Sequence, residues 1–289
     1  MLHHEIDRDP HPGRSPAIPP VDRELLDFAV ATSVAAGDLA AELFHASVPV
    51  RHKADGTEVT DADVAVEEFV RAELARRTPQ DAILGEEAGL TSGTSGRRWV
   101  VDPISGTAYF TRRMPLFATL LAYEDEHGSA VGVITSPMTG ETVFAGRGRG
   151  CWVQRRGDVR PARLGTRTDL DDALVLASNQ HTFSEDLLLA LHRRTAMVGG
   201  IHHPLLHLLT GRVDAVVMAC QGYDDLAPAP VLLAEAGGRV AALDGGPVLG
   251  QCGLSSGSGT LAAANPALLG QLLTVTKNLQ AVRRPKALR

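Results

Sequence analysis

The residues best suited to chemistry are three groups of carboxylates, each near the end of a short apolar run. They are Glu86 with Glu87, Asp102, and Asp224 with Asp225. Carboxylates at strand ends can meet in one crevice even when they are far apart in sequence. Without Lys or Arg among them they repel one another, so they stay ionised at low cost only around a cation. Their oxygens favour Mg²⁺ or Mn²⁺. The alternative for any single group is a helix N-cap or a solvated loop charge.

The segment Asp-Pro-Ile-Ser-Gly-Thr at 102–107 joins one of these acids to a pattern suited to phosphate. Pro103 makes a turn after the apolar run, and Ser105-Gly106-Thr107 begins a predicted helix. The free N–H groups of Gly106 and Thr107 at such a helix N-terminus would point toward a phosphate. A metal carboxylate a few residues before a phosphate site suits metal-assisted hydrolysis of a phosphate ester. The alternative is a plain Pro-Ser-Gly turn.

The histidines His202, His203 and His207 form a second pattern. His203 and His207 are four residues apart on a predicted helix, which is a spacing that zinc ligands use. No Glu lies between them and no third ligand stands out, so solvated or core histidines are the favoured interpretation. The next alternative is that His202 or His203 faces the substrate.

The remaining candidates are weaker. The three cysteines, Cys151, Cys220 and Cys252, are widely spaced and odd in number, which favours inert thiols in a reducing cytoplasm over a disulfide framework or a zinc site. Arg112 and Arg113 follow the phosphate motif, where they would either attract an anionic substrate or lie in solvent.

The elements that position these residues belong to an ordinary globular chain. It has 289 residues, of which 44% are hydrophobic and 21% charged, so overall disorder is excluded and one large domain or two modest ones are expected. Net charge is −6 with no basic block, which argues against nucleic acid as a partner. No apolar run reaches the roughly 18 residues that cross a bilayer, and no signal peptide is visible, so we expect a cytoplasmic protein without a membrane partner.

Apolar periodicity predicts helices that alternate with strands. Helical spacing covers 21–43, 63–76, 187–192, 203–210 and 226–236. Strand-like runs cover 82–85, 99–101, 116–123, 130–134, 142–145, 174–177, 215–218 and 238–243. This alternation predicts a layered α/β fold. We expect a mobile tail at 1–20, an N-terminal α+β half at 21–160 with the metal and phosphate motifs, a C-terminal α/β half at 161–289 that completes the site, and a flexible loop at 253–259.

Taken in order, these motifs resemble those of the inositol monophosphatase family of Mg²⁺-dependent, lithium-sensitive phosphatases. Gly85-Glu86-Glu87 is similar to the family's G-E-E motif, and the segment 99–110 is similar to W-V-I-D-P-I-D-G-T-x-N-F. Asp225-Leu226-Ala227, together with the segment 235–238, is similar to D-x-A…E-A-G-G. The segment 59–63 is similar to V-T-x-x-D. The resemblance covers roughly residues 22 to 280. It implies a five-layer αβαβα sandwich, a homodimer, and hydrolysis of a small phosphorylated metabolite with two or three Mg²⁺ or Mn²⁺ ions.

The same resemblance implies roles for individual positions. Glu86, Asp102 and the carbonyl of Ile104 would hold one metal, and Asp102 with Asp225 would help to hold a second. Gly106 and Thr107 would bind the phosphate. Asp63 would accept a hydrogen bond from the Thr107 hydroxyl, and this pair with Glu86 would orient the attacking water. A Thr hydroxyl is no base at neutral pH, so it needs such a carboxylate behind it.

The chain departs from the family pattern at two motif positions. Ser105 stands where the family has a metal-binding Asp, and Tyr109 stands where it has Asn. A neutral hydroxyl is the weaker Mg²⁺ ligand. We hypothesise that Asp224, beside Asp225, restores the missing charge; its alternative is a solvated neighbour. Ser105 leaves three interpretations open: a phosphatase with a weaker second metal, which we favour, a binding module that has lost hydrolysis, or another reaction on a phosphorylated metabolite.

Two positions bear on the substrate. Inositol-type members have an acid where this chain has Met218, and histidinol-phosphatase-like members have an Asp where it has Ile201. Neither substrate is therefore supported by its own recognition residue. We expect a less hydroxylated or unusual phosphate ester, in contact with Ser105, Gly106, Thr107 and Asp225.

Overall fold

The computed structural model describes residues 18–46, 49–53, 58–178, 183–199, 203–219, 221–248, 259–277 and 279. The chain divides into two compact units. The first runs to Ala162 and also includes residues 227–236, and the second consists of Arg163–Leu226 and the chain from Gly237 onward. The predicted tail lies outside the described residues up to position 17, as does the predicted loop up to position 258.

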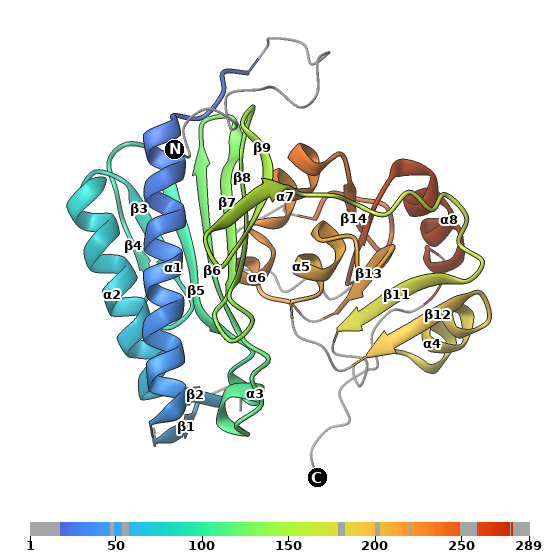
Figure 1. Ribbon diagram of the computed structural model, residues 1–289, viewed down its shortest axis with the longest axis horizontal. Helices are drawn as coiled ribbons and strands as arrows, with labels where there is room; N and C mark the ends of the chain where they lie inside the picture. Colours follow the sequence, from blue (N-terminus) through green and yellow to red (C-terminus); the bar gives the residue numbers. More distant parts are fainter. Residues whose placement is uncertain are drawn as a thin grey trace. The chain divides into compact units, whose positions relative to one another are not determined.

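The first unit is built on an eight-stranded sheet in the order β10-β9-β8-β7-β6-β5-β3-β4 (Figure 1). Its strands are β3 (Ala82–Gly85), β4 (Gly89–Thr91), β5 (Arg98–Ser105), β6 (Ala118–Asp125), β7 (Gly128–Ser136), β8 (Glu141–Gly146), β9 (Gly150–Arg155) and β10 (Asp158–Pro161). Within this sheet β3 and β5 pair in parallel, and the other neighbours pair antiparallel.

Two helices cover one face of this sheet. Helix α1 (Arg23–His45) begins at Asp22, whose side chain accepts the N–H of Glu24, and α2 (Asp61–Arg77) begins with a capping box between Thr60 and Asp63. Such caps satisfy N–H groups that have no partner inside the helix. The core under α1 and α2 includes Val131 and Val133 of β7.

A third helix, α7 (Ala229–Ala236), covers the opposite face. Val131 and Val133 point toward α1, and successive side chains of a strand point to opposite faces, so the side-chain position of Gly132 is on the face away from α1. A Cβ atom at Gly132 would lie 2.7 Å from the Pro228 carbonyl oxygen and 3.0 Å from Val231. The absence of a side chain at this position therefore lets the start of α7 approach the sheet closely.

A small aromatic cluster anchors the short helix α3 (Thr107–Thr111). The ring of Phe110 lies 5.4 Å from that of Phe44 in α1 and 5.0 Å from that of Phe117. Beside α3, a two-stranded hairpin joins β1 (Val50–His52) to β2 (Glu58–Thr60) and leads into α2. Aromatic residues make up only 4% of the chain, so this cluster concentrates much of its aromatic packing under the predicted phosphate segment.

The second unit is built on a five-stranded mixed sheet in the order β12-β11-β13-β15-β14. Its strands are β11 (Ala173–Ser178), β12 (Thr195–Gly199), β13 (Ala215–Met218), β14 (Arg239–Ala242) and β15 (Thr260–Ala263). Its helices are α4 (Glu185–His192), α5 (Pro204–Leu209), α6 (Tyr223–Leu226) and α8 (Pro266–Thr276). Leu187 and Leu191 of α4 share a core with Leu268 and Leu272 of α8. Helix α5 packs against β11 and β13.

The layered α/β prediction is confirmed, and two of the local differences involve the segments that carry predicted site residues. The strand that we expected to end at Val101 continues to Ser105, with a register shift between Asp102 and Ser105 that accommodates Pro103. The helix expected at 226–236 is divided into α6 and α7 around Pro228, because a proline disfavours helical backbone in the residue before it. Among the described residues, no helix combines the length and the apolar character that a membrane span requires.

Candidate metal and phosphate site

The irregular end of β5 brings several predicted site residues together. Asp102 and Ser105 are only 2% and 3% exposed, and Ile104 is fully buried. Gly106 follows with φ of 100°, a left-handed backbone that favours glycine, and it is the N-cap of α3. Thr107 is the first residue of that helix and is partly exposed. The chain therefore changes from buried strand to accessible helix within the predicted motif.

Thr107 forms the contacts expected of a positioned hydroxyl. Its Oγ1 lies 3.0 Å from Oδ1 of Asp63 and 3.1 Å from the carbonyl oxygen of Ile104. Oδ2 of Asp63 accepts the N–H of Thr60 at 2.7 Å and the hydroxyl of Thr60 at 2.6 Å. Asp63 is fully buried, and this burial raises the pKa of its carboxyl although the bonds from Thr60 and Thr107 act in the opposite direction. Both oxygens of Asp63 are thus held in place.

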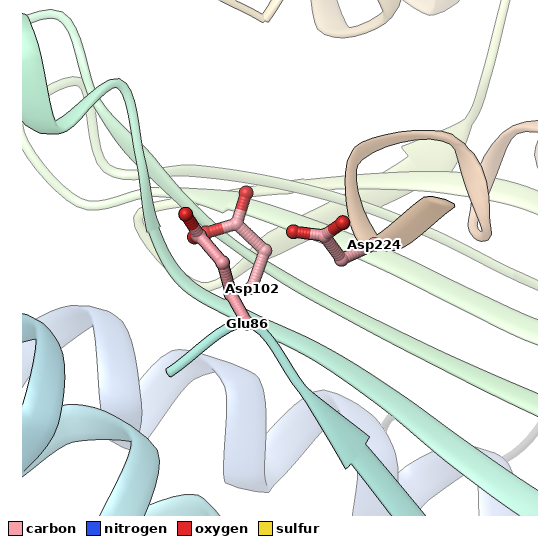
Figure 2. A group of neighbouring side chains, drawn as sticks. All are labelled: Glu86, Asp102 and Asp224. Atoms are coloured by element: carbon pink, nitrogen blue, oxygen red, sulfur yellow. The ribbon is translucent and has the colours of Figure 1, made fainter. Parts of the chain in front are cut away.

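The carboxylates of Glu86 and Asp102 lie close together in the same unit. Each offers an oxygen within 4.8 Å of the other, and Figure 2 shows the two side chains next to each other. Glu86 follows β3 and Asp102 lies in β5, and these two strands pair in parallel with Gly85 opposite Val101. The parallel register therefore accounts for this approach of two residues that are separated in sequence.

Lys53 places a positive charge beside this pair. Its Nζ lies 2.7 Å from Oε1 of Glu86 and 2.9 Å from Oε1 of Glu87. Burial alone would lower the pKa of the Lys53 ammonium, but the bonds to both glutamates raise it above its usual range. Burial raises the pKa of Glu87 to about 7 against the effect of Lys53. The assumption that no Lys or Arg lies among these acids is therefore wrong for Glu86 and Glu87. The sequence does not reveal this contact, because 33 residues separate Lys53 from Glu86.

The remaining predicted acids belong to the second unit. Asp224 and Asp225 lie in α6, and Oδ2 of Asp225 accepts the N–H of Gly222 at 3.2 Å. Figure 2 also labels Asp224. Both side chains are partly exposed. Their roles as metal ligands remain predictions.

The histidine pattern does not form a zinc site in the described part of the chain. His203 precedes α5 with φ of 54° and is buried, and His207 lies within the helix. Neither belongs to a group of three His, Cys, Asp or Glu ligands among the described residues. His202, Ile201, Cys220 and Cys252 lie outside the described residues.

Two further side chains agree with the inert alternatives. Cys151 is buried, which raises the pKa of its thiol above the usual range. Arg112 is exposed and donates to Oε2 of Glu58 at 3.1 Å, as a solvated surface charge would.

Sequence reasoning missed one buried carboxylate next to the site. Glu67 of α2 accepts the backbone N–H groups of Glu87 and Ala88 at 2.7 and 2.9 Å. It lies four residues after Asp63, so both acids are on one side of the helix. This spacing was available in the sequence, but an acid four residues before Arg71 is typical of a solvated helical ion pair.

The donors in the first unit fit a hard divalent cation. Glu86 and Asp102 supply carboxylate oxygens close to one another, and the carbonyl of Ile104 lies beside Thr107. Oxygen donors of this kind suit Mg²⁺ or Mn²⁺ better than zinc or copper.

Sequence comparison finds a matching family profile and similar proteins with different named activities. The profile of the "Inositol monophosphatase family" matches residues 22–281. A histidinol-phosphatase of Mycobacterium tuberculosis is 35% identical over 230 residues, which cover 77% of this chain and 85% of that protein. A Streptomyces griseus protein named glucose-1-phosphate thymidylyltransferase is 37% identical over 221 residues, with 73% and 83% covered.

A solved structure shares the fold. The extragenic suppressor protein suhB from Bartonella henselae matches with a TM-score of 0.79 and 23% identity, covering 88% of this chain and 99% of that one. At this identity the similarity shows the fold alone, whereas the family profile spans most of the sequence. This chain therefore belongs to the inositol monophosphatase family.

Proposed function

We propose that the protein is a phosphomonoesterase that hydrolyses a small phosphate monoester with a divalent cation at Glu86 and Asp102. The observation that carries the proposal is the proximity of these two carboxylates, together with the Thr107 hydroxyl held between Asp63 and the carbonyl of Ile104. Membership of the inositol monophosphatase family supports the same reaction class.

The proposed cation is Mg²⁺, with Mn²⁺ as a substitute. Glu86, Asp102 and the carbonyl of Ile104 would hold it, and Asp225 with Asp224 would add ligands for a second or third ion. A bound ion would lower the pKa of water and neutralise the leaving alkoxide. Ser105 offers a neutral hydroxyl near Asp102, so we propose that the second ion is held more weakly than the first.

The chain itself would prepare the attacking water. Because the Thr107 hydroxyl donates to Asp63, its oxygen keeps lone pairs that can accept a proton from the water. As it accepts that proton, the hydroxyl would pass its own proton to the Asp63 carboxylate, and Glu86 would help to orient the water. The N–H groups of Gly106 and Thr107 would bind the phosphate oxygens at the start of α3.

The substrate would be a small phosphorylated metabolite. The name of the Mycobacterium tuberculosis relative refers to the phosphatase reaction of histidinol phosphate, a small phosphate monoester. Met218 is an apolar side chain at the end of β13, where it offers no charge to sugar hydroxyls. We therefore propose that the substrate is an ester with fewer hydroxyl groups than inositol phosphate. We also propose that the protein is a cytoplasmic homodimer, and light scattering can measure this stoichiometry.

The proposal is tested by phosphate release from sugar, polyol, nucleotide and amino-alcohol phosphates across a Mg²⁺ titration. Turnover of one ester that stops with EDTA and returns with excess Mg²⁺ supports the proposal. Turnover that persists in excess EDTA contradicts it. The second candidate function is a protein that binds a phosphorylated metabolite without hydrolysing it, and the observation that favours it is the buried Ser105 at a motif position where a carboxylate is expected. Binding of esters without release of phosphate from any of them would favour this second candidate.

A further inference from the structure

The turn that carries Glu86 joins two strands at one edge of the first sheet. Glu86, Glu87 and Ala88 connect β3 to β4, with Gly85 paired to Gly89 on either side. Gly89 has φ of 67°, which is left-handed backbone. β4 is the last strand at this edge, and Glu86 is exposed. The position of the Glu86 carboxylate therefore depends on whatever fixes the turn.

Glu67 contacts this turn from beneath. Its side chain is only 2% exposed. Oε2 accepts the N–H of Glu87 at 2.7 Å, and Oε1 accepts the N–H of Ala88 at 2.9 Å. A buried carboxylate is costly unless such donors satisfy it. The two backbone groups that immediately follow Glu86 are thus bound to one buried side chain.

Arg71 extends this contact to the second strand. Its Nε donates to Oε1 of Glu67 at 2.7 Å, which balances the buried charge. Its Nη1 donates to the hydroxyl of Thr91 at 3.0 Å, and its Nη2 donates to the carbonyl of Gly89. The planar guanidinium thereby binds Glu67 within α2 and joins this helix to β4 through two acceptors, the Thr91 hydroxyl and the Gly89 carbonyl.

The absence of a side chain at Gly85 makes room for this pair. A Cβ atom there would lie 2.2 Å from Oε1 of Glu67 and 2.7 Å from Nη2 of Arg71. Glycine is therefore required at 85 for Glu67 to reach the turn, although the backbone there needs no left-handed conformation.

Helix α2 thus holds two separate parts of the candidate site. Asp63 accepts the hydroxyl of Thr107, and Glu67, one turn later, fixes the segment after Glu86. Both carboxylates are buried on the same side of the helix.

We propose that Glu67, braced by Arg71, is a positioning residue that sets the Glu86 carboxylate for binding of the divalent cation. This inference rests on the proposed function of Glu86 as a metal ligand. Partners that orient a ligand without touching the metal typically change affinity by about 10- to 100-fold when they are removed. Loss of Glu67 should therefore weaken metal binding, whereas the KM for the phosphate ester at saturating metal should change little.

The test compares Glu67→Gln with Glu68→Gln in the full chain. Glu68 is the adjacent residue of α2 and is exposed, so it controls for the same chemical change on the same helix. Mn²⁺ binding, followed by the electron paramagnetic resonance of free Mn²⁺, gives affinity without turnover. We expect the Mn²⁺ dissociation constant of Glu67→Gln to rise about tenfold or more, with that of Glu68→Gln at the wild-type value.

Hydrogen exchange in metal-free protein gives an independent readout of the turn. Glu67→Gln should speed exchange at the amides of Glu87 and Ala88, and Glu68→Gln should not. Thermal melts check that both variants fold. Should Glu67→Gln fail to fold, Arg71→Lys keeps the positive charge but loses the planar contacts to Gly89 and Thr91, and it should also raise the Mn²⁺ dissociation constant, by a smaller factor.

The outcomes separate this inference from the function on which it rests. Wild-type Mn²⁺ affinity and exchange in a folded Glu67→Gln variant would overturn the positioning role and leave the phosphatase proposal intact. A raised KM for the ester with unchanged Mn²⁺ affinity would overturn it as well. If the wild type neither binds Mn²⁺ nor releases phosphate, both proposals fail.

Discussion

The Thr107 hydroxyl lies 3.0 Å from Oδ1 of Asp63, although 44 residues separate the two in the chain. Asp63 is the N3 residue of the α2 capping box and Thr107 is the first residue of α3, so this hydrogen bond links the starts of two helices. One carboxylate therefore supports the end of a helix and the hydroxyl of the candidate site. This double use explains how a polar hydroxyl obtains a fixed orientation at an accessible position.

Removal of that hydroxyl should slow catalysis. In Thr107→Val the shape of the side chain is kept, but the attacking water loses its proton acceptor. We expect kcat at saturating Mg²⁺ to fall on the order of 10²-fold, as measured by phosphate release. Thr107→Ser keeps the hydroxyl and should retain most activity. A Val variant with kcat close to that of the wild type would show that the hydroxyl takes no part in the reaction.

Ser105 should limit the affinity of the second ion. It is buried in β5 opposite Ala118 of β6, close in sequence to Asp102. Ser105→Asp adds a carboxylate, and we expect the Mg²⁺ concentration for half-maximal activity to fall about tenfold, which corresponds to about 1.4 kcal/mol. Ser105→Asn is the neutral control of the same shape. If the Asn variant shows the same gain as the Asp variant, charge is not the cause.

Packing of α7 against the first sheet should depend on Gly132. Gly132→Ala places a methyl group 2.7 Å from the Pro228 carbonyl oxygen, a backbone atom that cannot move independently. We expect a loss of about 1–3 kcal/mol in the free energy of unfolding, measured in urea. Gly270→Ala in α8, where a Cβ atom meets nothing within 4 Å, should instead leave stability unchanged or raise it. Equal stability of Gly132→Ala and wild type would contradict the observed contact.

A partly buried ion pair should give the free energy of unfolding a defined pH dependence. Oδ1 and Oδ2 of Asp125 lie 2.9 and 2.6 Å from the two terminal nitrogens of Arg147. Burial by itself would raise the pKa of the Asp125 carboxyl, but the bonds from Arg147 and from the N–H of His127 lower it overall. A lowered pKa in the folded state adds stability above the unfolded value of about 4, and this stability is lost as pH falls through the folded value.

Asp125→Asn should therefore be less stable than the wild type by about 1.5–3 kcal/mol at pH 7. Urea unfolding from pH 7 to pH 3 should show this difference narrowing below about pH 4. A difference that stays constant across that range would mean that the charge of Asp125 contributes nothing. Asp158→Asn, a change at an exposed residue of β10, is the matched control.

Local sequence patterns predicted the parts of the fold that depend on local physics. Apolar periodicity predicts α1 and α2 to within a few residues of their observed bounds, and the residue pattern at 102–107 indicates a phosphate segment. What the sequence could not predict depends on contacts between distant residues. Lys53 reaches Glu86 and Glu87 across 33 residues, and α7 joins the first unit through a close approach to Gly132.

Glu67 shows the same limit from another direction. A glutamate four residues before an arginine is typical of a solvated helical ion pair, yet in the folded protein Glu67 is almost fully buried and bound to two backbone N–H groups. Burial decides its role, and burial follows from the packing of α2 against the β3–β4 turn. For Ser105 the sequence shows the change directly, because a serine stands where the family motif has an aspartate. The effect of that change depends on the charges around the metal, which the sequence does not show.

Phosphate release by Asp102→Asn tests the central claim most directly. Asp102 is buried beside Glu86, and the Asn variant keeps its size while removing the charge that a divalent cation needs. With the best ester of the panel and saturating Mg²⁺, we expect the variant to lose at least about 10²-fold in kcat and to bind Mn²⁺ more weakly. Asp158→Asn should match the wild type. An Asp102→Asn variant as active as the wild type, with the same Mg²⁺ dependence, would contradict a metal-dependent phosphatase site at Glu86 and Asp102.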